Sequence, residues 1–423
     1  MRTLSWILAV LLFAFPAAAG AVTMEEAVEY AEQYADDARI ARETATEIEA
    51  RGRQTTAFIW PQVNASASYL EIGDNREENR MFPFLNTPER DISAEIAGSQ
   101  VLFAGMRIWN SLDLKDNLYE QADFTVKTGV RDVRGNVRQA FDEVLLERAN
   151  VKILEDRVEQ RRAELKDAND LWEAGVATPL DARQANLNLN FSLDALTSGQ
   201  VSYEEALIDL NTVMGVPPGN ELLVPEGRLE DHPDMDLLLD KLRDALARDD
   251  LLDLNSTRIR KAGARLEQDI AKGGYYPEVA FVSQAESSGP EFDEMDESWA
   301  VGIQMNWAIF EGWLTRAKTA AAAARVRQIE HGYRKTRRDL SGRIESFEVN
   351  LKALRKRIEL QKEAVSLSRE NYEDARGQYR AGTITLTRLG DFSLAYAEAR
   401  FNLARLYYIQ RRLARGMESL LNA

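Results

Sequence analysis

Two short stretches decide the fold of this chain: Trp172-Glu173-Ala174-Gly175-Val176-Ala177-Thr178 and Tyr379-Arg380-Ala381-Gly382-Thr383-Ile384-Thr385. Their glycines stand 207 residues apart, and the same separation relates Phe103 to Phe310, each at the end of a β-like run. Aromatic–proline pairs, Trp60-Pro61 and Tyr276-Pro277, open those runs. The chain therefore consists of two copies of one unit, in which strands are followed by a long helical hairpin.

The segments between the strands and the turns have the pattern of very long helices. From Arg107 to Trp172 there is no proline and there are two interior glycines, Gly129 and Gly135, and a helix of that length would extend about 100 Å. Apolar residues recur at steps of three and four, interrupted at Arg161, which is typical of coiled-coil faces. They are Val151, Leu154, Val158, Leu165, Ala168 and Trp172, repeated in Ile358, Val365, Tyr372, Ala375 and Tyr379.

The turns carry residues that end one helix and begin the next. Gly175 and Gly382 can adopt the left-handed conformation that stops a helix. Thr178, followed by Pro179 and Asp181, fits a helix N-cap with a carboxylate near the positive helix end. Each turn therefore reverses the chain into an antiparallel hairpin.

Boundaries follow from this duplication. Residues 1–21 have the pattern of an export signal, with Arg2, an apolar core and a small-residue cleavage site. We expect a first repeat at 22–215, with one helix beginning at a Thr23–Glu26 capping box, strands at about 61–70 and 91–103, and a tip near 173–181. A linker rich in proline and glycine, 216–235, leads to a second repeat at 236–423, with one helix, strands at about 277–287 and 298–310, and a tip near 379–391.

One strand shows the clearest alternation of apolar with small or polar residues. Its apolar positions are Trp299, Val301, Ile303, Met305 and Trp307. A soluble β-sandwich would also alternate, but the length of about ten residues and the aromatic residues at the strand ends favour a tilted membrane strand. Four strands cannot close a barrel, since the smallest membrane barrels use eight, so identical copies must share one. Geometry permits two, three or four copies.

Composition excludes several classes of function. The formal net charge of -16 argues against nucleic-acid binding, and the absence of cysteine removes disulfides and thiol chemistry. No nucleophile motif, phosphate-binding glycine loop or metal-ligand cluster is present, so we expect no enzyme activity, no cofactor and no metal. No stretch after the signal reaches the roughly 18–20 apolar residues of a membrane-spanning helix.

The chain resembles the TolC-like outer-membrane efflux proteins over essentially its whole mature length. The resemblance rests on Val22-Thr23-Met24-Glu25-Glu26-Ala27, the two aromatic–proline pairs, Phe310-Glu311-Gly312, and Tyr379-x-x-Gly382-Thr383 leading to Leu389-x-Asp391. It implies a mixed, mainly α-helical protein of the Gram-negative outer membrane: a homotrimer with a twelve-strand barrel and a helical periplasmic tunnel. A membrane-fusion adaptor and an inner-membrane transporter would open it, in a tripartite efflux or type I secretion system. The cargo could be a drug, a metal ion or a polypeptide.

The resemblance also implies roles for residues at the tips. Gly175, Thr178, Gly382 and Thr383 match the hairpin tips where an adaptor docks. Asp181 and Tyr379 match residues that hold the tip shut, and Asp391 matches an aspartate of the constriction. Ile384 and Arg388 stand where the family prototype has an arginine and a second aspartate. The residues themselves leave simpler roles open: Asp181 as a helix-end carboxylate, Tyr379 as core packing, and Asp391 as a solvated side chain. The alternative function is a periplasmic coiled-coil scaffold or adaptor without a barrel.

Overall fold

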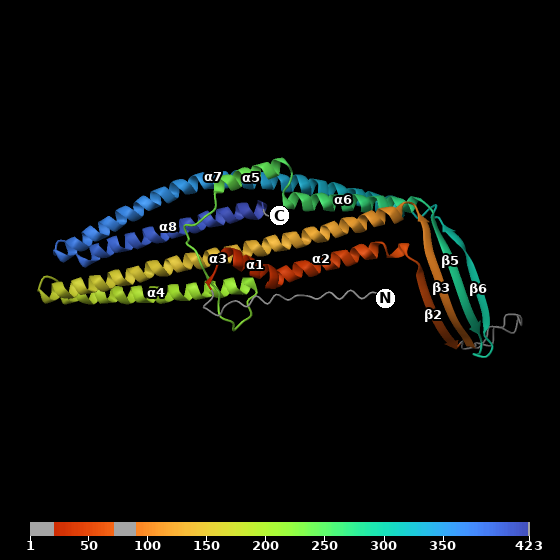
Figure 1. The fold of residues 1–423 in the computed structure, drawn as a ribbon, viewed down its shortest axis with the longest axis horizontal. Coiled ribbons are helices and arrows are strands. Elements are labelled where there is room, and N and C mark those ends of the chain that lie inside the picture. The colour runs from red at the N-terminus through yellow and green to blue at the C-terminus, as the bar shows by residue number, and fades with distance from the viewer. Residues whose placement is uncertain (1–20, 72–89, 422–423) are drawn as a thin grey trace, which may run out of the picture. The chain divides into compact units, whose positions relative to one another are not determined.

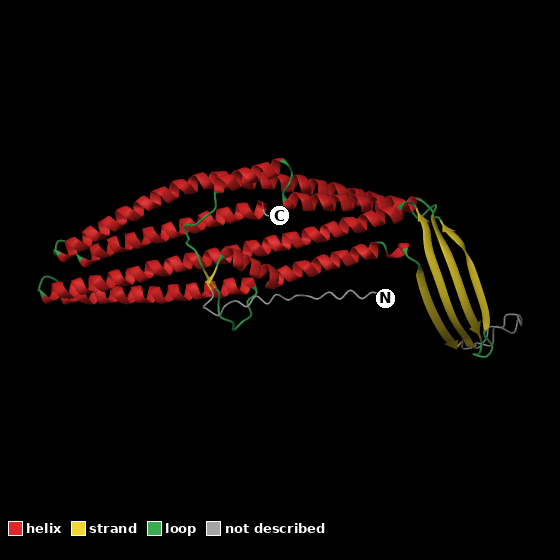
Figure 2. Cartoon of the chain, in the orientation of Figure 1, coloured by secondary structure: helices red, strands yellow, loops and turns green. Residues whose placement is uncertain are grey.

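Long helices, a four-stranded sheet and a short two-stranded sheet make up the computed structural model, which describes residues 21–71 and 90–421 (Figures 1 and 2). The first half contains β1 (Ala21–Val22), α1 (Met24–Tyr34), α2 (Asp36–Thr55), β2 (Gln62–Glu71), β3 (Arg90–Ala104), α3 (Arg107–Glu173) and α4 (Pro179–Met214). The second contains β4 (Val224–Pro225), α5 (Met235–Ala247), α6 (Leu252–Lys272), β5 (Glu278–Gly289), β6 (Asp296–Asn306), α7 (Leu314–Arg380) and α8 (Leu386–Leu421). The expected export signal lies almost entirely outside the described residues.

The predicted duplication of strands and helical hairpins is confirmed. Helices α3 and α7 both contain 67 residues, and α4 and α8 both contain 36. Both long helices begin after a pair of left-handed residues, Gly105-Met106 and Gly312-Trp313, with φ between 59° and 69°. The expectation of one helix before each pair of strands was wrong, because each half has two. The first pair meets at Ala35, in an extended conformation, and the second at Asp249, which has a φ of 52°.

The chain divides into two units, and each unit takes residues from both repeats. Of the described residues, one unit comprises 21–41, 127–252 and 339–421, and holds both hairpin turns. The other comprises Arg42–Val126 and Asp253–Arg338, and holds the four long strands. Cores therefore form between the repeats as well as within them, so neither repeat is an independent domain.

The sheet in the second unit is antiparallel, in the order β2-β3-β5-β6. Hairpins β2–β3 and β5–β6 belong to one repeat each, and the central β3–β5 pair joins the two repeats, with a bulge between Val101 and Phe103. Beside this pair, Arg107 forms an ion pair with Glu278. The sheet is thus continuous across the chain, with β2 and β6 as its outer strands.

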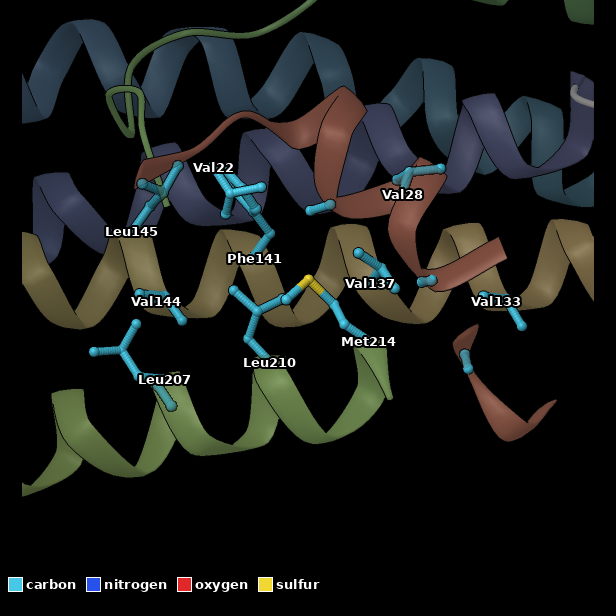
Figure 3. Packing of buried hydrophobic residues seen from close by; sticks show 14 of the residues in the cluster. Val22, Val28, Val133, Val137, Phe141, Val144, Leu145, Leu207, Leu210 and Met214 are labelled. Atoms are coloured by element: carbon cyan, nitrogen blue, oxygen red, sulfur yellow. The ribbon is translucent and has the colours of Figure 1, made fainter. Parts of the chain in front are cut away.

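The main core of the first unit lies where α1 packs on α3 and α4. Figure 3 shows Phe141, Leu210 and Met214 in this cluster, all buried and contributed by α3 and α4. The stretch expected as a linker also takes part: β4 pairs in parallel with β1, and the Asn211 side chain bonds the main chain of Leu223 in both directions, at 2.9 and 3.1 Å. This stretch is consequently fixed to the core rather than a simple connection.

Candidate functional site

The sheet has one apolar and one polar face, and both are exposed in a single copy. The strand registers place Val301, Ile303 and Met305 on the same face as Ala65 and Ile96. Side chains on this face are open to the surroundings, with Ile303 72% and Trp299 78% exposed. A contiguous apolar surface of this kind marks an interface with lipid or with another protein. The strand pattern read from the sequence therefore corresponds to a real two-faced sheet.

The opposite face is lined by polar and small side chains. It carries Asn64, Ser66 and Ser68 from β2 and Gln304 from β6, with Glu95 directly opposite Glu286 in the central pair. Like charges facing each other across a strand pair are unfavourable unless water or a counter-ion screens them. This face is therefore suited to water, as the apolar face is suited to lipid.

Exposed aromatic residues gather where the strands meet the helices. Those at least 40% exposed are Trp60, Phe103, Trp109, Tyr275, Tyr276, Trp307, Phe310 and Trp313. The Trp307 Nε1 donates to the Tyr275 carbonyl oxygen at 3.3 Å, and Phe310 packs edge-on against Trp313. Trp307 lies just after the end of β6, although the sequence placed it in the strand. Amphipathic rings at such positions are typical of a membrane–water interface.

The two tips share one backbone geometry. Gly175 and Gly382 have φ values of 72° and 71°, and both turns close with the same pair of hydrogen bonds. In the first, Gly175 N–H donates to Trp172 O and Val176 N–H to Leu171 O, each at 2.9 Å; in the second, Gly382 and Thr383 make the equivalent bonds at 2.9 and 3.0 Å. A Cβ added to Gly175 would meet nothing within 4 Å, so its surface is free to receive a partner.

The threonines of the two tips have different roles. Thr178 and Asp181 form a capping box, in which Asp181 Oδ2 accepts from the Thr178 N–H at 2.9 Å and from its hydroxyl at 2.8 Å. This is the N-cap that the sequence predicted. The Thr383 hydroxyl instead donates to the carbonyl oxygen of Gln378 at the end of the preceding helix, at 2.9 Å. Asp181 therefore has a structural task whether or not it also holds the tip shut.

Tyr379 is buried, and its hydroxyl makes no hydrogen bond to any residue in the described part of the chain. Burial raises the pKa of this hydroxyl, and the negative charges of Asp181, Asp167 and Glu164 raise it further. The phenol thus stays protonated near three carboxylates. A direct Tyr379–Asp181 bond is not present in this single copy.

Arg388 and Asp391 lie on the exposed face of the first turns of α8. Their closest charged atoms are 3.9 Å apart, and the Arg388 guanidinium also lies 4.9 Å from the Phe392 ring centre. Both side chains are more than 60% exposed. An exposed pair of this kind contributes at most about 1 kcal/mol, so these groups are available to whatever passes or binds.

A charge cluster with buried carboxylates joins the two hairpins near the tips, and the sequence analysis did not identify it. Asp167 of α3 is 7% exposed, accepts from Arg376 Nε of α7 at 2.9 Å, and lies 3.6 Å from Arg380 Nε. Six residues earlier, Arg161 donates to Glu164 at 2.6 Å, and both side chains are buried. The sequence does contain one indication of this cluster, because Arg161 places a charge at an apolar position of the helical repeat.

Burial of this cluster affects its ionisation. Burial raises the pKa of Glu164, and the adjacent Arg161 guanidinium opposes that rise. Buried ion pairs contribute little to stability compared with apolar packing, whereas removing one partner is costly. Within the cluster, the Asp167–Arg376 bond joins α3 to α7, whereas the Arg161–Glu164 pair lies within α3.

Two other kinds of feature are absent from residues 21–71 and 90–421. No three histidine, aspartate or glutamate side chains there are placed to hold a metal ion. In the same residues, no helix carries an apolar stretch long enough to cross a bilayer.

Comparison with known proteins places these features among channel proteins. A model of the outer membrane efflux protein family matches residues 37–216 and 242–423. The fold is similar to CusC (TM-score 0.77, 16% identity, 95% of this chain and 92% of that one) and to the Campylobacter jejuni CmeC outer membrane channel (0.78, 13%, 94% and 85%). It is also similar to the outer membrane protein VceC of Vibrio cholerae (0.73, 16%, 94% of each chain). A search of curated proteins found no match.

Proposed function

Because this chain belongs to the outer membrane efflux protein family and serves efflux at the outer membrane, we propose that three copies close a shared barrel and helical tunnel. The assembly is a passive exit duct, and a partner transporter supplies the energy. The observation that carries this proposal is the two-faced, four-stranded sheet with open outer strands. Four strands cannot enclose a pore, and three copies would supply twelve.

The hairpin tips form the gate and the docking site in this proposal. The first tip projects the exposed apolar side chains of Val176 and Leu180, which are 63% and 65% exposed. Gly175, Thr178, Gly382 and Thr383 are the contact points for a periplasmic membrane-fusion adaptor. Asp181, Tyr379, Arg388 and Asp391 line the constriction, and the adaptor with its inner-membrane transporter opens it. The duct itself carries out no chemical step.

Conductance tests the duct directly. We expect the purified oligomer to produce discrete ion-conducting steps in planar lipid bilayers, because a closed ring of two-faced sheets has a continuous wet interior. The resting current should be small while the tips are closed. A chain that stays monomeric in detergent and never conducts would exclude the proposal and favour a periplasmic scaffold.

The gate makes a separate prediction. Replacing Tyr379 with phenylalanine and Asp181 with asparagine together should raise the resting conductance severalfold, because the first change removes a hydroxyl and the second removes a negative charge beside the constriction. Thr178→Ala is the matched control, since it disrupts the capping box but leaves Tyr379 and the charge of Asp181 in place. If Thr178→Ala raises the current equally, the effect comes from the helix cap and the gating role is rejected.

A further inference from the structure

Among the residues that the structure describes, no strand pairs with the outer edge of either outer strand of the sheet. In the order β2-β3-β5-β6, strands β2 and β6 each have a single neighbour. Unpaired backbone groups in lipid cost several kcal/mol each, so these edges need partners. The internal duplication of the chain indicates what that pairing is.

The internal repeat relates each strand residue of the first half to a counterpart in the second half. Residues of β2 correspond to residues of β5 that lie 216 positions later, as Trp60-Pro61 does to Tyr276-Pro277. Residues of β3 correspond to residues of β6 that lie 207 positions later, as Phe103 does to Phe310. The strand pairing agrees with this correspondence. Val63 faces Gly98 in the first hairpin, and their counterparts, Val279 and Met305, face each other in the second.

The central β3–β5 pair joins one repeat to the next, so it is a template for the contact between copies. In it, Ala97 faces Gln284. The counterparts of these residues are Gln304 of β6 and Ser68 of β2. We propose that β6 pairs antiparallel with β2 of a second copy, in the register that places Gln304 opposite the partner subunit's Ser68. This inference rests on the shared barrel proposed above. It gives the residue register of the β6–β2 contact between copies, here called the seam.

The two faces of the sheet agree with this register. It places Ile303 opposite the partner subunit's Tyr69, and Met305 opposite the partner subunit's Ala67, so the apolar faces of the copies are continuous. A shift of one residue would place the apolar face of β6 beside the polar face of β2, because side chains alternate along a strand. Only shifts by an even number of residues preserve both faces.

The open space beside Gly312 supports the same register. A Cβ added to Gly105 would lie 2.6 Å from the Gly273 carbonyl oxygen and 2.6 Å from Tyr276 Cβ, whereas one added to its counterpart Gly312 meets nothing within 4 Å. The counterparts of Gly273 and Tyr276 are Ala57 and Trp60, and Trp60 is 69% exposed. In the proposed seam, the partner subunit's Trp60 covers Gly312.

The lengths of the strands point the same way. Strand β3, which is paired on both sides, runs to Ala104, whereas β6 ends at Asn306, five residues short of the counterpart of Ala104. The sequence predicted a strand to about residue 310. We attribute the early end to the missing partner strand, and pairing with a second copy would extend β6 through Glu311.

Disulfide cross-linking tests the register, and the chain has no cysteine of its own. The test variant carries Gln304→Cys with Ser68→Cys, oxidised in outer-membrane preparations. Within one copy these positions lie on the two outer strands, which are three strand spacings or at least about 14 Å apart, too far for a disulfide. We expect cross-linked oligomers on denaturing gels. Ala97→Cys with Gln284→Cys has the same facing relation inside one chain, and should give a disulfide-bonded monomer.

Two shifted pairs define the register. Gln304→Cys combined with Ser66→Cys or Leu70→Cys displaces the cysteines by two residues, roughly 6.6 Å along the strand, and should cross-link at least tenfold less. Stronger cross-linking by either shifted pair, or none by any pair, would overturn the proposed seam. Conductance of the unmodified protein, measured in parallel, separates the two proposals: a conducting oligomer with another register leaves the duct intact, and a non-conducting monomer overturns both.

Discussion

Replacing Ile303 with arginine is expected to prevent assembly in the outer membrane. Ile303 lies on the apolar face of β6 and is 72% exposed in a single copy. A charged side chain on the lipid face of a membrane barrel costs about 2–4 kcal/mol near the bilayer midplane, and a shared barrel incurs that cost in every copy. The measurement is the amount of heat-resistant oligomer extracted from outer membranes, which should fall at least tenfold.

The neighbouring residue provides the control. Gln304 belongs to the same strand but its side chain lies on the polar face, so Gln304→Arg places the same charge in water and should assemble normally. Equal yields for the two arginine variants would show that the apolar face does not meet lipid. They would favour the scaffold function over the duct.

Replacing Asp167 with asparagine is expected to open the resting duct. The change removes the charged acceptor of the 2.9 Å bond from Arg376, and leaves two arginines between the hairpins without their carboxylate. Hydrogen bonds to charged groups contribute about 1.5–3 kcal/mol, which corresponds to a change of roughly tenfold to a hundredfold in the balance between closed and open tips. The measurement is single-channel open probability at neutral pH without adaptor.

An ion pair on the same helix separates this effect from a general loss of charge. Arg369 and Glu373 form a 2.8 Å pair on the surface of α7, and both are more than half exposed. Glu373→Gln should leave open probability unchanged, because an exposed pair of this kind contributes about 0.3–0.5 kcal/mol and does not join two hairpins. If the two variants raise the current to the same extent, Asp167 does not hold the hairpins together.

Much of the fold was predictable from residue periodicity. The spacing of 207 residues between the two turns, the absence of proline from the long segments and the alternation around Ile303 each depend on local chemistry, and the helices and strands formed as predicted. The cap at Thr178 was also predictable, since it needs only residues three apart. Predictions about helix breaks were less successful: the helix pairs that precede the strands break at Ala35 and Asp249, where no glycine or proline marks the end.

The sequence by itself determined a duplicated strand-and-hairpin chain with a two-faced sheet, because periodicity and turn chemistry are properties of neighbouring residues. Only the tertiary structure showed that Asp167 meets Arg376 and that β3 rather than β2 faces β5. Both kinds of contact join residues more than 170 positions apart. Such contacts depend on how the two repeats dock against each other, and the energy of docking is distributed over whole helix and strand faces rather than over any short motif.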